Sequence, residues 1–319
     1  MTDASSPRVL IAEPNDFTPA AVELLRTKAV VDVRKLQAAD LGEALEKYDA
    51  VWIRLGHRVD ARVLRHARRC RVIACAVTGL DHIDLDACAE RGIQVLSLRG
   101  EREFLREVRA TAEHTVGLTL ALIRRTVTAA TSVNAGEWDR DKFRGTELYC
   151  KTAGIVGVGR LGSIVGGYFA ALGMDVLGID DGPFEDPTIT AAASLDDLLA
   201  RADVVSLHVP LAPETEHLIS AQELATMKPT AVLINTSRGG VVDDVALVQA
   251  LRNESIAGAA LDVVASEPDV GVNHPLVRYA REHDNLILTP HIGGNTHESF
   301  EKTEMFVARK VLRALEGEP

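Results

Sequence analysis

TAGIVGVGRLGSIVGGYFAALGMDVLGID, residues 152–180, is the stretch that decides the expected fold of this chain. It opens with an apolar run that has the length and composition of a buried parallel strand. Gly157, Gly159 and Gly162 follow in the spacing G-x-G-x-x-G, and a helical segment and a second apolar run then lead into Asp180. This order of strand, glycine turn, helix, strand and acid predicts a doubly wound α/β unit.

The glycine turn has the features that a dinucleotide site needs. Gly157 permits a tight turn, Gly159 lets the backbone approach a pyrophosphate, and Gly162 lets the helix pack close to the strand. The free N–H groups at the start of the helix, at Arg160 and Leu161, are placed to hold the phosphate charge. The alternative is a glycine-rich strand–helix turn that binds nothing.

Asp180 indicates which dinucleotide is expected. It ends the second strand, where a carboxylate can accept hydrogen bonds from a ribose diol. The same negative charge would repel a 2′-phosphate. We therefore expect NAD rather than NADP as the cofactor.

The composition of the whole chain limits the classes of protein to consider. With 319 residues, 46% apolar and 25% charged, it is typical of a soluble globular protein of two domains or one large one. A formal charge of −11 argues against a nucleic-acid or membrane surface as partner. No apolar run reaches the ~20 residues needed to span a bilayer, and the first residues lack the pattern of a signal peptide. A cytoplasmic protein is expected.

The cysteines and histidines predict no metal site. Cys70, Cys75, Cys88 and Cys150 lack C-x-x-C spacing, so we expect reduced, buried thiols. The pairs His57/His66 and His82/His114 also lack a ligand pattern.

Apolar periodicity predicts the order of the elements. Strands alternate with helices over residues 9–96, which predicts a first parallel α/β unit with its own core. A long helix is expected at residues 110–125, crossing from the first unit to the second. The final segment, residues 298–315, has the spacing of a helix and is too short to be a domain, so we expect it to cover the first unit.

Polar clusters follow three later strands of the second unit. They contain Arg238, the pair Asp262 and Glu267, and His291. A histidine beside a carboxylate can donate and accept protons, and an arginine offers a fixed fork for a carboxylate and a carbonyl oxygen. With a nicotinamide as hydride source, these groups suit reduction of a 2-oxo acid or oxidation of a 2-hydroxy acid. The alternatives are a surface His291, a capping Asp262 and a salt-bridged Arg238–Glu267 pair.

The sequence also resembles a known family over almost its whole length. Seven stretches carry the resemblance, in order: VTGLDHIDLDAC, TAEHTVGLTLAL, KTAGIVGVGRLG, HVPLAPETEHLI, LINTSRGGVVDDVAL, GAALDVVASEP and TPHIGGNT. They are similar to the D-isomer-specific 2-hydroxyacid dehydrogenases. The resemblance implies two Rossmann-like, doubly wound parallel-sheet domains. The NAD-binding domain, residues 109–294, would be inserted into a substrate domain formed by residues 1–108 and 295–319.

The resemblance also implies roles for individual residues. Arg238 would bind and polarise the substrate, Glu267 would be the partner of His291, and His291 would be the general acid/base. Asp262 would lie near the nicotinamide end of the cofactor. Further cofactor contacts are implied for Thr78, Val209, Thr215, Thr236, Ser237, Arg238, His291 and Gly294. The substrate would contact Arg54, Val77, Thr78, Gly79 and Arg238.

The chain departs from the family pattern at several places. The connection at residues 97–112 is longer and more charged than usual, Cys150 replaces a common glycine, and His82 replaces a common asparagine. No regulatory domain is expected after the final helix. Arg102 and Arg106 either lie on a solvated helix face with i,i+4 charge pairs or, together with Arg54, meet a phosphate or second acid on the substrate.

Two classes of function therefore remain open. The first is an NAD-dependent dehydrogenase acting on a phosphorylated or phosphonylated 2-oxo acid, or on a small acid such as glyoxylate or hydroxypyruvate. The second is a non-catalytic, NAD-sensing protein that binds a partner, because some relatives use the fold in this way. The family usually pairs through its cofactor domains, which implies a homodimer.

Overall fold

A computed structural model describes residues 6–317 of the chain and shows two compact α/β units. Unit 1 comprises the described residues up to Val108 and those from Thr296 onwards, and unit 2 is Arg109–Asn295. Each unit has its own parallel sheet, and each sheet has helices on both faces. The predicted fold class is confirmed.

Unit 1 is built on a five-stranded parallel sheet in the order β2-β1-β3-β4-β5. Its strands are short and mostly apolar, as expected where both faces are covered. They are β1 (Arg8–Ile11), β2 (Val30–Val33), β3 (Ala50–Trp52), β4 (Val72–Ala74) and β5 (Gln94–Leu96). The strand order reverses between β1 and β3, so the carboxyl ends of these two strands form the switch point of the sheet.

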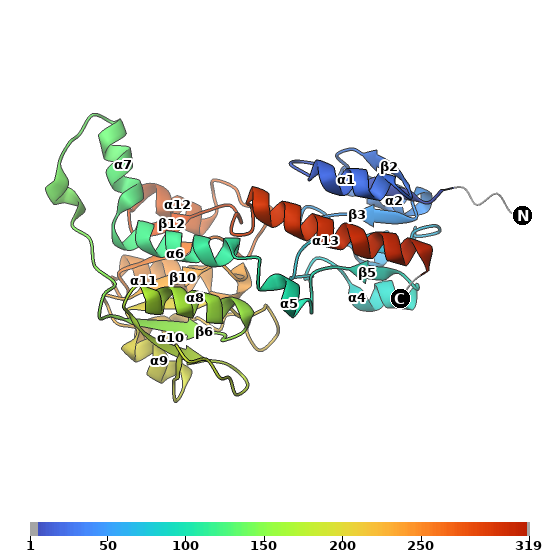
Figure 1. Cartoon of the computed structure of the whole chain (residues 1–319). Helices are drawn as coiled ribbons and strands as arrows, with labels where there is room; N and C mark the ends of the chain where they lie inside the picture. Colours follow the sequence, from blue (N-terminus) through green and yellow to red (C-terminus); the bar gives the residue numbers. More distant parts are fainter. Residues whose placement is uncertain (1–5, 318–319) are drawn as a thin grey trace, which may run out of the picture. The chain divides into compact units, whose positions relative to one another are not determined.

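The two faces of this sheet are covered by different helices. One face packs on α2 (Leu41–Lys47), α3 (Ala61–Leu64) and α4 (Leu85–Glu90). The other face packs on α1 (Pro19–Arg26) and α13 (His297–Glu316), which lie side by side in Figure 1. Val307, Ala308 and Val311 of α13 are fully buried there. The last helix of the described chain therefore completes the core of unit 1.

Unit 2 contains a seven-stranded parallel sheet in the order β12-β11-β10-β9-β6-β7-β8. The order reverses between β6 and β9, which places the switch point directly beside the glycine turn that follows β6. The strands are β6 (Thr152–Val156), β7 (Asp175–Ile179), β8 (Thr190–Ala191), β9 (Val204–Leu207), β10 (Val232–Asn235), β11 (Gly258–Leu261) and β12 (Leu286–Leu288).

Helices cover both faces of the unit 2 sheet. One core forms against α6 (Ala110–Ile123) and α8 (Arg160–Ala171). The other forms against α9 (Leu195–Arg201), α10 (Ala221–Thr226), α11 (Asp244–Arg252) and α12 (Pro275–Glu282). This is the two-sided covering that continuous apolar strands require.

The helix expected at residues 110–125 differs from the expectation in two ways. It ends at Ile123, and it lies wholly within unit 2, so the expectation that it crosses between the units was wrong. The charged residues before it form only one helical turn, α5 (Arg102–Leu105), in which Leu105 is the buried residue. A second helix, α7 (Thr126–Asn134), follows at once and has no buried residue.

Cys150 corrects a further expectation. Cys70, Cys75 and Cys88 are buried free thiols, whereas Cys150 is exposed. Its φ of 58° lies in the left-handed region, which favours glycine. The glycine that the resemblance implies at this position would adopt this conformation without strain.

Candidate active site

The polar clusters identified in the sequence come together because their strands are neighbours. Arg238 follows β10, Asp262 follows β11 and His291 follows β12. These three parallel strands are adjacent in the unit 2 sheet, and the carboxyl ends of parallel strands meet at one edge. The structure thus brings an arginine, two carboxylates and an imidazole to one edge of unit 2.

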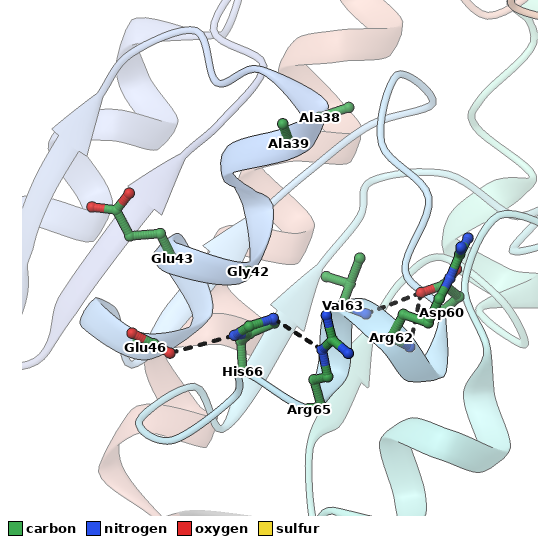
Figure 2. A pocket seen from close by; sticks show the side chains of 10 residues that line it. All are labelled: Ala38, Ala39, Gly42, Glu43, Glu46, Asp60, Arg62, Val63, Arg65 and His66. Atoms are coloured by element: carbon green, nitrogen blue, oxygen red, sulfur yellow. Dashed lines mark hydrogen bonds and ion pairs between the residues drawn. The ribbon is translucent and has the colours of Figure 1, made fainter.

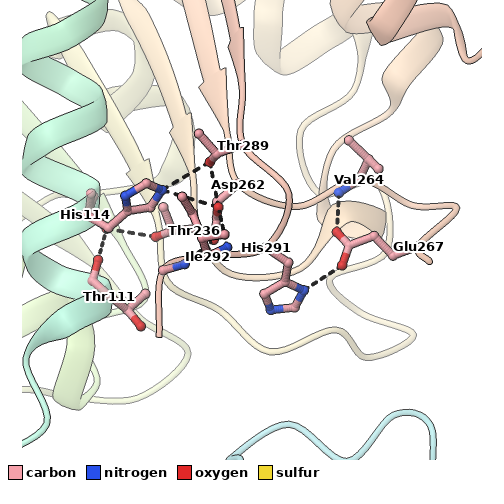
Figure 3. A network of polar contacts seen from close by, with 11 residues as sticks. Thr111, His114, Thr236, Asp262, Val264, Glu267, Thr289, His291 and Ile292 are labelled. Carbon is pink, nitrogen blue, oxygen red and sulfur yellow. Dashed lines mark hydrogen bonds and ion pairs between the residues drawn. The ribbon is translucent and has the colours of Figure 1, made fainter. Parts of the chain in front are cut away.

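His291 and Glu267 form the most direct contact at this edge. Nδ1 of His291 lies 2.5 Å from Oε2 of Glu267, and Oε1 accepts the backbone N–H of Val264 at 2.7 Å (Figure 3). An ionised carboxylate only accepts hydrogen bonds, so Nδ1 carries the proton of this contact. The other ring nitrogen, Nε2, is then the atom left to exchange a proton with a ligand. Both side chains are about 29% exposed, which makes such an exchange possible.

Asp262 lies behind this pair as a buried anion. Its side chain is 1% exposed and accepts hydrogen bonds from the Thr289 hydroxyl at 2.6 Å and from the backbone N–H groups of Ile292 and Gly293. Burial alone would raise the pKa of Asp262, but these bonds and the contact with His114 together lower it below its ordinary value. Asp262 therefore fixes the backbone that follows His291.

Arg238 is held by a tight backbone crossing. A Cβ on the next residue, Gly239, would lie 1.9 Å from the carbonyl carbon of Val264, so only glycine fits between these two loops. The side-chain amide of Asn235 donates to the Arg238 carbonyl at 2.9 Å, and Nη1 of Arg238 donates to the Ser237 carbonyl at 2.7 Å. These contacts anchor the arginine loop against the loop that carries Glu267.

The glycine turn of unit 2 fits a dinucleotide. Gly157 has a φ of 92°, and a Cβ on Gly162 would lie 2.0 Å from the Gly157 carbonyl oxygen. By contrast, a Cβ on Gly159 would meet nothing within 4 Å, which leaves open space directly above the start of α8. Burial and the nearby Arg109 lower the pKa of Arg160, which together with Leu161 opens the helix. Open backbone, helix start and positive charge are what a pyrophosphate requires.

Asp180 is placed at the rim of this turn. Its Oδ2 accepts the backbone N–H of Val158, inside the glycine turn, at 2.6 Å. The neighbouring Asp181 has its pKa raised by its hydrogen bond to Asp180 and by the negative charge there. Two acids at the end of β7 disfavour a phosphate at this point, which fits NAD better than NADP.

The other implied cofactor residues of unit 2 lie on loops around the same sheet edge. Val209 lies near Gly157, since its Cγ1 would be 2.9 Å from a Cβ there. The Thr215 hydroxyl closes a turn by donating to the Pro210 carbonyl at 2.6 Å. The hydroxyl groups of Thr236 and Ser237 contact Thr115 and Asn235, and a Cβ on Gly294 would meet only Thr111 Oγ1, at 4.0 Å.

The implied substrate residues of unit 1 lie at the carboxyl ends of its strands. Val77, Thr78 and Gly79 form the turn after β4, in which Thr78 is exposed. Arg54 follows β3 at the switch point, and its guanidinium is already bound within unit 1. Nη2 donates to the buried carboxylate of Glu304 at 2.5 Å, and Nη1 donates to the Asn15 carbonyl at 2.6 Å.

Three residues at the unit 2 sheet edge were missed or set aside in the sequence analysis. His114 and Thr289 contact Asp262, and His208 follows β9 beside the glycine turn. Burial lowers the pKa of His208 to about 3, so its ring is neutral. A signal did exist for His208 and Thr289, because both follow strands directly. His114 stands in the stretch TAEHTVGLTLAL, but no spacing rule indicated its partners, because its contacts join residues far apart in the chain.

A pocket elsewhere in unit 1 is a weaker candidate. It has a volume of about 490 Å³ and lies between α2 and α3 (Figure 2). Its charged side chains contact one another: His66 lies 3.5 Å from Glu46 and 3.1 Å from Nε of Arg65, and Asp60 accepts hydrogen bonds from Arg62. These mutual contacts leave no set of groups directed at a ligand.

Two further kinds of site were sought among residues 6–317. No three His, Cys, Asp or Glu side chains in this range are grouped closely enough to hold a metal ion. Within the same range no helix combines the length and the apolar character that crossing a membrane demands.

Comparisons with known proteins agree with this site geometry. Residues 116–293 match the family model described as the NAD-binding domain of D-isomer specific 2-hydroxyacid dehydrogenases. The chain is 37% identical to the D-3-phosphoglycerate dehydrogenase of Synechocystis sp. over 98% of its own length, but it spans only 55% of that relative. It is also 37% identical to the glyoxylate reductase of Thermofilum pendens, covering 97% of this chain and 86% of that protein.

A solved structure agrees with these matches. The D-lactate dehydrogenase of Aquifex aeolicus, complexed with NAD and lactic acid, superposes with a TM-score of 0.84 at 29% identity. The alignment covers 98% of this chain and 96% of that one. A solved relative that aligns over nearly its whole length thus contains bound NAD.

Proposed function

Because this chain belongs to the D-isomer specific 2-hydroxyacid dehydrogenase family, whose NAD-binding domain it contains, we propose that it transfers a hydride between NAD(H) and a 2-hydroxy acid or its 2-oxo acid. The expected family and the cofactor NAD are confirmed by these matches, and the relatives are named as dehydrogenases and reductases of the expected class. The activity of this chain is a proposal, because the chain spans only slightly more than half the length of relatives such as the Synechocystis protein.

The contact between His291 and Glu267 carries the proposal. Glu267 holds Nδ1 of the imidazole, so Nε2 is the atom that would give a proton to the C2 oxygen of a 2-oxo acid. Arg238, on the adjacent strand end, would bind the substrate carboxylate and polarise the carbonyl. The nicotinamide, when bound, supplies the hydride. In the reverse direction Nε2 would accept the proton of the 2-hydroxyl group.

The remaining site assignments are part of the same proposal. The cofactor would contact the glycine turn, Asp180 and the loop positions named for it above, with Asp262 near the nicotinamide end. The domain assignment is proposed as well: unit 2 would bind the cofactor, and unit 1 would supply the substrate turn formed by Val77, Thr78 and Gly79.

For the substrate, we favour a small unphosphorylated 2-oxo acid such as glyoxylate or hydroxypyruvate. Arg54 is the unit 1 arginine at the switch point, and Glu304 and the Asn15 carbonyl already bind its guanidinium. The adjacent Glu13 is also an anion, because its hydrogen bonds with His57 and the backbone outweigh burial and lower its pKa. Glu304 on the Arg54 guanidinium and Glu13 on the Arg54 backbone N–H are two negative charges that would repel a phosphate.

A phosphorylated 2-oxo acid remains the second candidate. It is favoured by the names of the D-3-phosphoglycerate dehydrogenases among the relatives.

A substrate panel tests the proposal. NADH oxidation should be followed with glyoxylate, hydroxypyruvate, pyruvate and 3-phosphohydroxypyruvate. We expect turnover, with the highest kcat/KM on an unphosphorylated acid. A higher kcat/KM on 3-phosphohydroxypyruvate would select the second candidate. Tight NADH binding without turnover on any member would favour the NAD-sensing binding protein.

We also propose that the protein is a cytoplasmic homodimer that pairs through unit 2. Exposed apolar side chains gather on and after α7, where Val127, Val133 and Trp138 are 51%, 47% and 88% exposed. Such a patch is typical of a surface that another chain covers. Light scattering should give twice the chain mass, and Trp138→Glu should shift the protein toward monomer. The free thiols fit a reducing compartment.

A further inference from the structure

His114 makes two polar contacts at the back of the candidate active site. It lies in the second turn of α6, and its Nε2 is 3.3 Å from Oδ1 of Asp262 and 3.1 Å from Oγ1 of Thr289 (Figure 3). Its side chain is 21% exposed, whereas that of Asp262 is 1% exposed. An imidazole therefore closes the outer side of a buried carboxylate.

The hydrogen positions in this group follow from the chemistry of the three partners. The Thr289 hydroxyl has one proton, and its 2.6 Å contact with the Asp262 carboxylate uses it, since the carboxylate can only accept. The oxygen of Thr289 must then accept at its contact with His114. Nε2 of His114 consequently carries a proton directed at the Thr289 oxygen and at Asp262.

Asp262 transmits this arrangement to His291 through the backbone. Its carbonyl oxygen accepts the N–H of His291 at 2.8 Å, and its carboxylate accepts the next two N–H groups, those of Ile292 and Gly293, at 2.9 and 2.8 Å. His291 has a φ of 54°, a left-handed conformation that is strained for a residue other than glycine and persists only where the surroundings enforce it.

The loop formed by residues 291–293 also packs directly on α6. A Cβ on Gly293 would lie 3.0 Å from Oδ2 of Asp262 and 3.1 Å from Cγ2 of Thr111, one turn before His114. Next to it, the hydroxyl groups of Thr115 and Thr236 are 2.8 Å apart. The first turns of α6 thus pack against the residues that surround Asp262.

We propose that His114 is a positioning residue for the reaction: by holding Asp262 and Thr289 in place, it keeps the loop of His291 in the strained conformation that presents the imidazole to Glu267 and to substrate. The inference rests on the proposed function for its kinetic consequence. Its structural consequence, the ordering of residues 291–293, is independent of any turnover.

The kinetic test compares His114→Leu with a matched control. His283→Leu makes the same substitution in unit 2, at an exposed position where the ring stacks on Tyr279 at 4.1 Å. With NADH and glyoxylate, we expect His114→Leu to lower kcat about tenfold, the effect of losing one hydrogen bond to a charged group. KM for glyoxylate and the melting temperature should stay near those of the control.

A deuterium isotope effect separates positioning from simple loss of folded enzyme. With NADH deuterated at both C4 hydrogens, the isotope effect on kcat should rise in His114→Leu, because hydride transfer becomes the slower step. A variant that merely unfolds in part would show a lower kcat with an unchanged isotope effect. An unchanged kcat, or a lower kcat without the rise, would overturn the proposal.

Hydrogen exchange provides a readout that needs no activity. In full-length His114→Leu, the backbone amides of residues 291–293 should exchange about tenfold faster than in the wild type, while those of β6 and α8 stay unchanged. Equal exchange at residues 291–293 in both proteins would refute the positioning role, even if the wild type proved inactive on every 2-oxo acid. Failure of the proposed function and failure of this inference are thereby distinguishable.

Discussion

Oε2 of Glu267 lies 2.5 Å from Nδ1 of His291, and the two residues come from loops that follow neighbouring strands. The carboxylate thus fixes which ring nitrogen faces the ligand. We expect His291→Ala to lower kcat by about 10²–10⁴-fold, the usual contribution of a general acid or base. NADH binding, followed by its fluorescence, should persist because the glycine turn is intact. Unchanged turnover would remove His291 from the mechanism.

Gly162 gives a sharp test of the cofactor turn. A Cβ there would lie 2.0 Å from the Gly157 carbonyl oxygen, so we expect Gly162→Ala to cost at least about 3 kcal/mol of stability and to abolish NADH binding. Gly167 is the matched control, because it lies on the same helix and a Cβ on it would meet no atom within 4 Å. Gly167→Ala should bind NADH normally and gain about 0.5–1 kcal/mol. Equal chemical-denaturation midpoints for the two variants would contradict the packing.

Asp180 should set the choice between NADH and NADPH. We expect Asp180→Ala to reduce the preference for NADH about tenfold, because the charge that repels a 2′-phosphate is gone. Asp196→Ala, which removes an exposed acid from the first turn of α9, serves as control and should leave the preference unchanged. The ratio of kcat/KM values for the two cofactors decides. An equal ratio in both variants would argue against the ribose role.

The Arg54–Glu304 pair should be a determinant of the stability of unit 1. Glu304 is 1% exposed, so Glu304→Ala leaves a half-buried guanidinium without its partner and should cost about 3–5 kcal/mol. The exposed ion pair of Lys47 and Glu43 is the control, and Glu43→Ala should have no measurable effect. Urea unfolding measures both. A loss no larger than that of the control would show that the Arg54 pair contributes little.

His208 predicts a dependence of stability on pH. Burial lowers its pKa from 6.5 to about 3 in the folded protein, whereas the unfolded chain takes up a proton near 6.5. The folded state therefore loses stability as the pH falls below 6.5, by about 2 kcal/mol at pH 5 from this residue alone. His208→Leu should lose about 2 kcal/mol less than the wild type between pH 7.5 and 5. Parallel curves for the two proteins would disprove the shift.

The sequence predicted those parts of the molecule that depend on local patterns. Apolar runs and glycine spacing predicted the strand, the turn and the helix around Gly157, and the order of strands brought Arg238, Asp262 and His291 to one edge. Helix α7 was missed because no residue in it is buried, so it has no apolar face to recognise. Helix α12 was missed although it buries Leu276 and Tyr279, because it follows a long irregular loop.

The finer arrangement of the site depends on contacts that sequence reasoning could not supply. The contact between His114 and Thr289 joins residues 175 positions apart, and that between Arg54 and Glu304 joins residues 250 apart. Neither pair has a spacing rule, because each depends on how helices pack on the sheets. The charged segment at residues 99–109 showed the opposite problem. Its composition suggested a helix, but only Leu105 provides the burial that stabilises a turn.

The packing of α13 on unit 1 has a consequence for synthesis of the protein on the ribosome. The apolar face formed by α1 and the first sheet is translated early, but the helix that covers it emerges only after all of unit 2. Because the amino-terminal part of a nascent chain begins to fold first, this face stays open to water while nearly two hundred residues are added. Unit 2 can form its own sheet during this time. The two segments of unit 1 can come together only after unit 2 has been translated. A ribosome stalled before residue 297 would therefore expose the uncovered apolar face of unit 1 to chaperones.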